Sequence, residues 1–126
     1  MESRKCIAAE NKRCGKYNCA QAVLCAYSDL TGLDEETSKN LAYAFAAGMG
    51  NMEGTCGAIV GAGMTLSMIT KDRAKAMKGM RVVMEKFKER NGSTICKDLK
   101  GIETKTVLRE CPDCVADACE FLEELL

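Results

Sequence analysis

Residues 48–64 read GMGNMEGTCGAIVGAGM, and this stretch constrains the fold more than any other part of the chain. Six of its seventeen residues are glycine, and a single cysteine, Cys56, lies in the middle. The pattern predicts a glycine-rich loop followed by a helix from Cys56 to about Met68, with Thr55 as its N-cap. Because this helix is apolar nearly all round, we expect it to be buried near the centre of the fold. Small residues four positions apart along it would let a neighbouring helix approach closely.

Apolar periodicity predicts further helices on both sides of this segment. Their expected ranges are 19–30, 35–47, 71–90, 94–99 and 111–126. Asn18, Asp34 and Ser93 are suitable N-caps, and Pro112 would lie in the first turn of the last helix, where its missing N–H costs nothing. No stretch alternates with the period of two that is typical of a strand. We therefore predict a single all-α domain over residues 1–126: a compact bundle of five or six helices around the buried Gly/Ala-rich helix, with residues 1–17 as a short N-terminal helix (2–13) or arm.

The charge and hydropathy of the chain argue against nucleic acids and membranes as partners. Lysine plus arginine and aspartate plus glutamate number 18 each, and no apolar run reaches the ~20 residues of a membrane span. The helix over 71–90 carries eight basic residues against three acidic ones, which is the usual pattern of a solvated face. This basic face could guide docking to an acidic redox protein. It could also pair with the acidic last helix, either within one chain or in a homodimer.

Nine cysteines among 126 residues, with no histidine, are the main deviation in composition. The count is odd, and the first residues lack the apolar region of a secretory signal, so we expect a cytoplasmic protein rather than a secreted disulfide scaffold. Cysteines in that setting are more often metal ligands or redox groups. The absence of histidine excludes mixed Cys/His zinc sites and Cys–His nucleophiles.

Four cysteines fall at predicted helix N-termini: Cys19, Cys56, Cys96 and Cys111. Free N–H groups and the helix dipole favour the thiolate at such positions, and a metal ligand must be that thiolate. Four such termini meeting at one point would form a positive pocket for an anionic metal–sulfur centre. The glycines around Cys56 would let the backbone approach such a centre and donate hydrogen bonds to its sulfurs. Helix ends and close packing alone explain these glycines equally well.

Five segments, in this order, resemble the motifs of the C-GCAxxG-C-C family. They are NCAQAVL (18–24), GMG (48–50), CGAIVGA (56–62), STICKDLKG (93–101) and CPDCVADACEFLEELL (111–126). Members of this family are described as redox-active proteins, and a similar domain occurs in split-Soret cytochromes, where it is associated with an iron–sulfur cluster of the [2Fe–2S] type. The resemblance implies a cluster bound by Cys19, Cys56, Cys96 and Cys111, with Gly57 beside it, for electron transfer or redox sensing. The haem-attachment pattern of the cytochromes is missing.

Other functions remain open for the cysteines. Cys111 and Cys114 form a C-x-x-C pair, so the chain could instead be a thiol–disulfide oxidoreductase, and Cys114 is a secondary candidate ligand. Four scattered cysteines could also bind zinc in a structural site. We interpret Cys25 and Cys119 as small hydrophobes or spare thiols, and Cys6 and Cys14 as mobile or interfacial.

Overall fold

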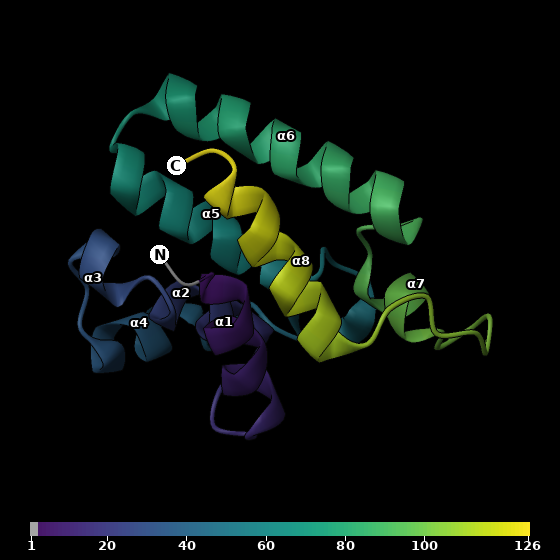
Figure 1. The fold of residues 1–126 in the computed structure, drawn as a ribbon. Coiled ribbons are helices and arrows are strands. Elements are labelled where there is room, and N and C mark those ends of the chain that lie inside the picture. Colours follow the sequence, from purple (N-terminus) through teal and green to yellow (C-terminus); the bar gives the residue numbers. More distant parts are fainter. Residues whose placement is uncertain (1–2) are drawn as a thin grey trace.

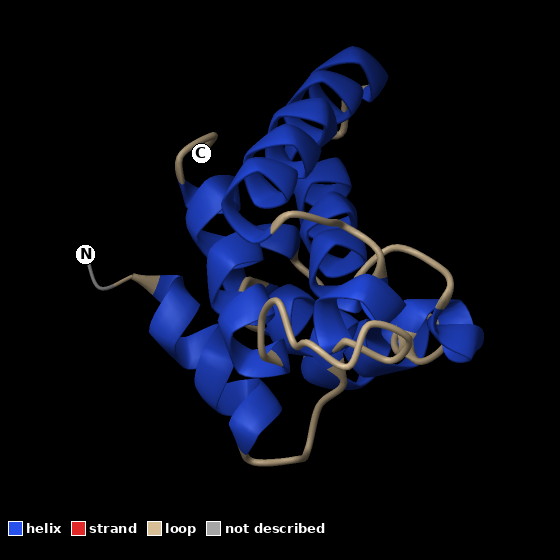
Figure 2. Cartoon of the chain, turned by 90° about the vertical axis from the view of Figure 1, so that its right-hand side faces the viewer, coloured by secondary structure: helices blue, strands red, loops and turns tan. Residues whose placement is uncertain are grey.

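The computed structural model describes residues 3–126, and these form eight α-helices and one π-helical turn with no strand (Figures 1 and 2). The elements are α1 (Arg4–Arg13), α2 (Cys19–Cys25), α3 (Ser28–Thr31), α4 (Glu35–Ala42), η1 (Gly48–Met52), α5 (Gly57–Thr70), α6 (Arg73–Asn91), α7 (Cys96–Lys100) and α8 (Cys111–Glu123). The all-α class is confirmed. The predicted N-terminal helix is also present, although its first expected residue lies outside the described part of the chain.

Helix α5 lies at the centre and packs against α2, α6 and α8 (Figure 1). Its glycines allow the backbones to touch. A Cβ atom added to Gly61 would lie 2.5 Å from the carbonyl oxygen of Ala20 in α2, so only glycine fits there. The expected buried Gly/Ala-rich helix is therefore confirmed, and its tight contact with α2 positions the beginnings of both helices.

The segment over 19–30, predicted as one helix, is instead divided into α2 and α3. The chain turns at Ala26 and Tyr27, and the Ser28 hydroxyl donates to the carbonyl of Cys25 at 3.0 Å in place of a helical N–H. Tyr27 is buried and its hydroxyl donates to the carbonyl of Cys119 in α8. A long-range contact thus ends α2 earlier than its periodicity predicts.

Three other predicted boundaries are also corrected. Helix α4 ends at Ala42 rather than near residue 47, because the Asn18 side-chain amide donates to the carbonyls of Ala42 and Tyr43 at the helix end. The N-cap of α5 is Cys56 and not Thr55, whose backbone forms an isolated bridge with Ile95. For the same reason the N-cap of α7 is Ile95 rather than Ser93.

The inner face of α6 is covered only in its later turns. Met77 is 52% exposed, whereas Val83 and Phe87 are fully buried against the core. Gly79 marks where close packing begins, since an added Cβ would lie 2.5 Å from the side chain of Leu66 in α5. Among residues 3–126, no helix has both the length and the apolar character needed to cross a bilayer.

Candidate functional site

Five cysteines line one small cavity at the end of the bundle where several helices begin. They are Cys19, Cys56, Cys96, Cys111 and Cys114. The cavity has a volume of about 10 Å³, which is room for about one water molecule. Four of the five cysteines are buried, and Cys111 is half-buried. The four cysteines predicted from the sequence are thus brought together, with Gly57 in the same wall and Cys114 as a fifth thiol.

The site is assembled from helix N-termini. Cys19, Cys96 and Cys111 are the first residues of α2, α7 and α8, and Cys56 is the N-cap of α5. Asn18 begins α2 with a complete capping box, accepting from the N–H of Gln21 while the Gln21 side chain accepts from Asn18. The N-terminal ends of these helices place partial positive charge around the cavity.

Backbone hydrogen bonds hold Cys56 and Cys96 on neighbouring segments of chain. The N–H of Cys56 donates to the carbonyl of Thr94 at 2.8 Å, and the N–H of Cys96 donates to that of Gly54 at 3.0 Å. Gly48 packs directly on Cys96, because a Cβ added to it would lie 2.8 Å from the Cys96 Cβ. The glycine-rich loop therefore serves close packing against a site cysteine.

The loop over residues 47–53 has an unusual backbone and places a methionine sulfur near Cys96. Ala47, Met49 and Met52 all have positive φ, which is uncommon outside glycine. The Sδ atom of Met52 lies 3.9 Å from the Sγ atom of Cys96, and Ala47 lines the cavity. This strained loop thus covers the cysteine-lined cavity on the Cys96 side.

The thiols interact as two pairs, each with one acidic member. A hydrogen bond from Cys19 lowers the pKa of Cys111 to about 6; burial opposes this shift, and the charge of Lys100 supports it. A hydrogen bond from Cys114 likewise lowers the pKa of Cys56, which also accepts from the N–H groups of Ala58 and Ile59.

The donor thiols have the opposite shifts. The hydrogen bond to Cys111, followed by burial, raises the pKa of Cys19, and the hydrogen bond to Cys56 does the same for Cys114. Burial raises the pKa of Cys96. Near neutral pH the cavity therefore favours the thiolate at Cys111 and the thiol at Cys19 and Cys114.

The family can be assigned on the match along nearly the whole chain. A family model described as "Putative redox-active protein (C_GCAxxG_C_C)" matches residues 17–125. The chain belongs to the C_GCAxxG_C_C family. No curated protein and no solved structure matches this chain. The predicted family is confirmed, and its description supports a redox role for this protein. The relation to split-Soret cytochromes stays a prediction.

The C_GCAxxG_C_C cysteines have the donor chemistry of a metal centre but, in the described residues, not its arrangement. Thiolates are the ligands that iron–sulfur clusters and zinc prefer, and buried helix N-termini suit an anionic centre. Within residues 3–126, however, no group of three or more Cys, Asp or Glu side chains is arranged to hold a metal ion. The donor chemistry thus fits a thiolate-bound centre, although the described side chains are not arranged around a metal ion.

Two cations of this C_GCAxxG_C_C site were not predicted from the sequence. Lys100 and Arg109 both line the cavity, and Lys100 hydrogen-bonds to Cys111. Burial lowers the pKa of Lys100, but the nearby sulfurs of Cys111 and Cys96 outweigh burial and raise it. Lys100 follows Cys96 by four residues, a helical spacing that could have indicated it. Arg109 lies in the connection over 102–110, where no periodicity could have indicated its position.

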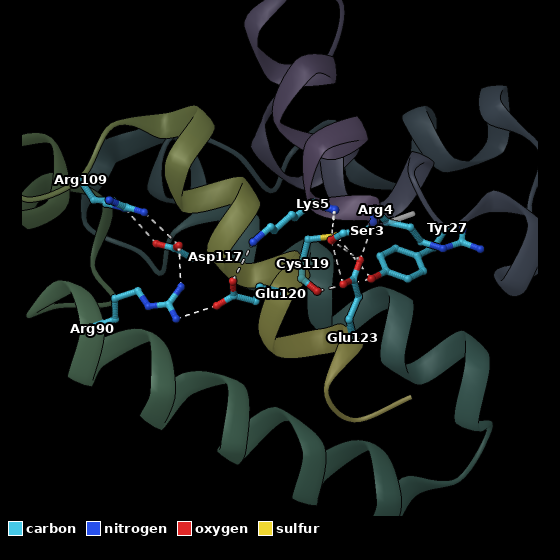
Figure 3. Close-up of polar contacts among 10 residues, drawn as sticks. All are labelled: Ser3, Arg4, Lys5, Tyr27, Arg90, Arg109, Asp117, Cys119, Glu120 and Glu123. Atoms are coloured by element: carbon cyan, nitrogen blue, oxygen red, sulfur yellow. Dashed lines mark hydrogen bonds and ion pairs between the residues drawn. The ribbon is translucent and has the colours of Figure 1, made fainter. Parts of the chain in front are cut away.

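The remaining cysteines of this C_GCAxxG_C_C protein lie away from the cavity. Cys6 and Cys14 are exposed, and Cys25 is half-buried. Cys119 is fully buried and donates to the hydroxyl of Tyr27 at 3.4 Å (Figure 3). Its packing fits the interpretation of a small hydrophobe with a weak hydrogen bond.

Proposed function

We propose that this redox-active family member binds a [2Fe–2S] cluster through Cys19, Cys56, Cys96 and Cys111 for electron transfer or redox sensing. The observation that carries the proposal is the meeting of four helix N-termini, each with a cysteine, at one buried cavity. A bound cluster would supply one-electron chemistry. The electron partner would be another redox protein.

The chain's own residues have three roles in this proposal. Lys100 and the helix N-termini balance the negative charge of the thiolates. The N–H groups of Ala58 and Ile59 donate to the Cys56 sulfur, which stabilises its anionic form. Leu99, which is buried, and Ala47 of the loop over 47–53 supply an apolar wall of the cavity.

Cys114 is proposed as a hydrogen-bond donor rather than a ligand. It lies one turn inside α8, and its thiol contacts the Cys56 sulfur. A donor at this place would tune the reduction potential without taking part in binding. Cys114→Ala should therefore retain the cluster with a shifted potential, whereas loss of iron from Cys114→Ala would assign it as a ligand.

Anaerobic reconstitution with iron and sulfide tests cluster binding. We expect visible absorption from thiolate-to-iron charge transfer, two iron and two acid-labile sulfide per chain, and loss of colour in each of four Cys→Ser variants. Cys25→Ser, half-buried outside the cavity, is the matched control and should retain the colour. A colourless wild-type protein without iron after reconstitution would refute the proposal, and tightly bound zinc would favour a structural metal site.

The thiol pairs favour thiol–disulfide exchange as a second candidate function. Cys111 hydrogen-bonds to Cys19, and Cys114 to Cys56, so the structure does not favour the C-x-x-C pairing of Cys111 with Cys114. In this reaction two thiols would lose two electrons and two protons to a disulfide-bearing partner, which is reduced to two thiols. Peptide mapping after oxidation distinguishes the functions. A reversible Cys19–Cys111 disulfide in iron-free protein would favour exchange.

A further inference from the structure

A second pocket lies next to the cysteine-lined cavity and is rich in cationic side chains. It has a volume of about 280 Å³ and receives residues from α1, α6, α8 and the loop before α8. Its four basic side chains are Lys5, Arg13, Arg90 and Arg109. Among the described residues, the acidic side chains of the lining are Asp117 and Glu120, so this part of the lining has an excess of two positive charges.

The two carboxylates are already bound by these cations and leave other N–H groups free to act as donors (Figure 3). Asp117 is buried, and it accepts from Arg90 at 3.0 Å, from Asn91 at 3.1 Å, and from Arg109 through Nε and Nη2 at 3.0 and 3.1 Å. Glu120 pairs with Lys5 at 3.1 Å and with Arg90 at 2.6 Å. The two carboxylates thus fix the orientation of Lys5, Arg90 and Arg109.

Each fixed cation keeps part of its hydrogen-bonding capacity for a ligand. A guanidinium has five N–H donors. Arg90 uses two of them to bind Asp117 and Glu120, and Arg109 uses two to bind Asp117. The side chains of Lys5 and Arg90 are each 42% exposed, and that of Arg109 is 37% exposed. Arg13 has only a 3.7 Å ion pair with the exposed Glu10, which does not line the pocket. The unused donors come from three separate elements around one hollow.

We propose that this pocket binds a small molecule bearing a phosphate group. A guanidinium can donate two parallel N–H groups to two phosphate oxygens at once. A preformed concave site with an excess of positive charge suits a small dianion such as a phosphate group. Arg109 joins the pocket to the redox site, because it lines both, and its carbonyl oxygen accepts from the Cys114 thiol at 3.8 Å. A ligand bound here would therefore lie beside the cysteines. Binding of the anion is independent of whether those cysteines hold a cluster.

Calorimetric titration of the reduced protein with inorganic pyrophosphate, against sodium chloride at matched ionic strength, tests the pocket. We expect saturable binding that weakens on the order of tenfold in Arg13→Gln, since hydrogen bonds to charged groups have about that effect. Arg81→Gln removes the same charge from an exposed arginine of α6 outside the pocket and should leave the affinity unchanged. Citrate as titrant distinguishes phosphate from carboxylate recognition: tighter binding of citrate than of pyrophosphate would overturn the assignment to phosphate.

A second readout uses Cys6, an exposed thiol of the pocket lining. Pyrophosphate should slow the alkylation of Cys6 by iodoacetamide, while the exposed Cys14, which does not line the pocket, should react at an unchanged rate. No saturable heat in the wild-type protein, equal weakening by Arg13→Gln and Arg81→Gln, or equal slowing of both thiols would each overturn the site.

Discussion

Two glycines of the same buried helix should respond oppositely to replacement by alanine. A Cβ added to Gly61 would lie 2.5 Å from the carbonyl oxygen and 3.0 Å from the Cα of Ala20, and backbone atoms cannot move aside without shifting α2. A Cβ added to Gly63 meets the Met80 sulfur at 3.1 Å and its methyl at 3.2 Å, which is the far end of a flexible side chain. Both changes gain about 1 kcal/mol of helix propensity.

The balance of these terms sets the expected magnitudes. Overpacking costs about 1–3 kcal/mol, and a clash with backbone that cannot move aside belongs to the upper part of that range, about 2–3 kcal/mol. After the propensity gain of about 1 kcal/mol, Gly61→Ala should lower the free energy of unfolding by about 1–2 kcal/mol. Gly63→Ala should be neutral or stabilising by up to about 1 kcal/mol, because Met80 can adjust its rotamer at little cost. The contrast between two alanines two residues apart isolates the close approach of α2 and α5.

Urea unfolding of the reduced proteins, followed by circular dichroism at the helix band, measures the difference. With a slope of about 2 kcal/mol per molar urea, Gly61→Ala should lower the midpoint by about 0.5–1 M. If Gly61→Ala is as stable as the wild type, or if both variants lose equal stability, the inferred backbone contact between α2 and α5 is wrong.

Three further outcomes follow from the electrostatics. Lys100→Gln removes a cation that supports the Cys111 thiolate, so the pKa of Cys111 should rise above about 6; the pH profile of its alkylation rate measures this, and an unchanged profile would contradict the contact. In the reduced, metal-free protein the depressed pKa of Cys111 adds stability that is present above its unfolded pKa and is lost as the pH falls through about 6. The raised pKa of Cys19 has the opposite effect, because it lowers the free energy of unfolding above about pH 8.5. Urea midpoints should therefore peak near pH 8, and a steady decline from pH 6 to 8 would contradict these shifts. Asp117→Ala removes a buried carboxylate from two partly exposed arginines and leaves the buried Asn91 amide without that acceptor, so the free energy of unfolding should fall by about 1–3 kcal/mol in the same urea assay; an unchanged urea midpoint would contradict its central role.

The sequence by itself determined the helical class, the burial of α5 and the positions of the site cysteines along the chain. These features depend on information that is local in the chain. Asn18 and Asp34 begin helices because their side chains accept from N–H groups three residues later. An apolar surface all round a helix permits only a buried place. A cysteine at the start of a helix can therefore be predicted from its neighbours in the sequence alone.

Only the tertiary structure decided where helices end and which thiols meet. The ends of α2 and α4 depend on contacts of Tyr27 with α8 and of Asn18 with Ala42 and Tyr43, which no local pattern contains. Cys111 is three residues from Cys114 in the chain, yet its thiol interacts with Cys19. Pairing between residues far apart is set by how α2, α5 and α8 pack together, and helical periodicity specifies a face of one helix without specifying what covers it.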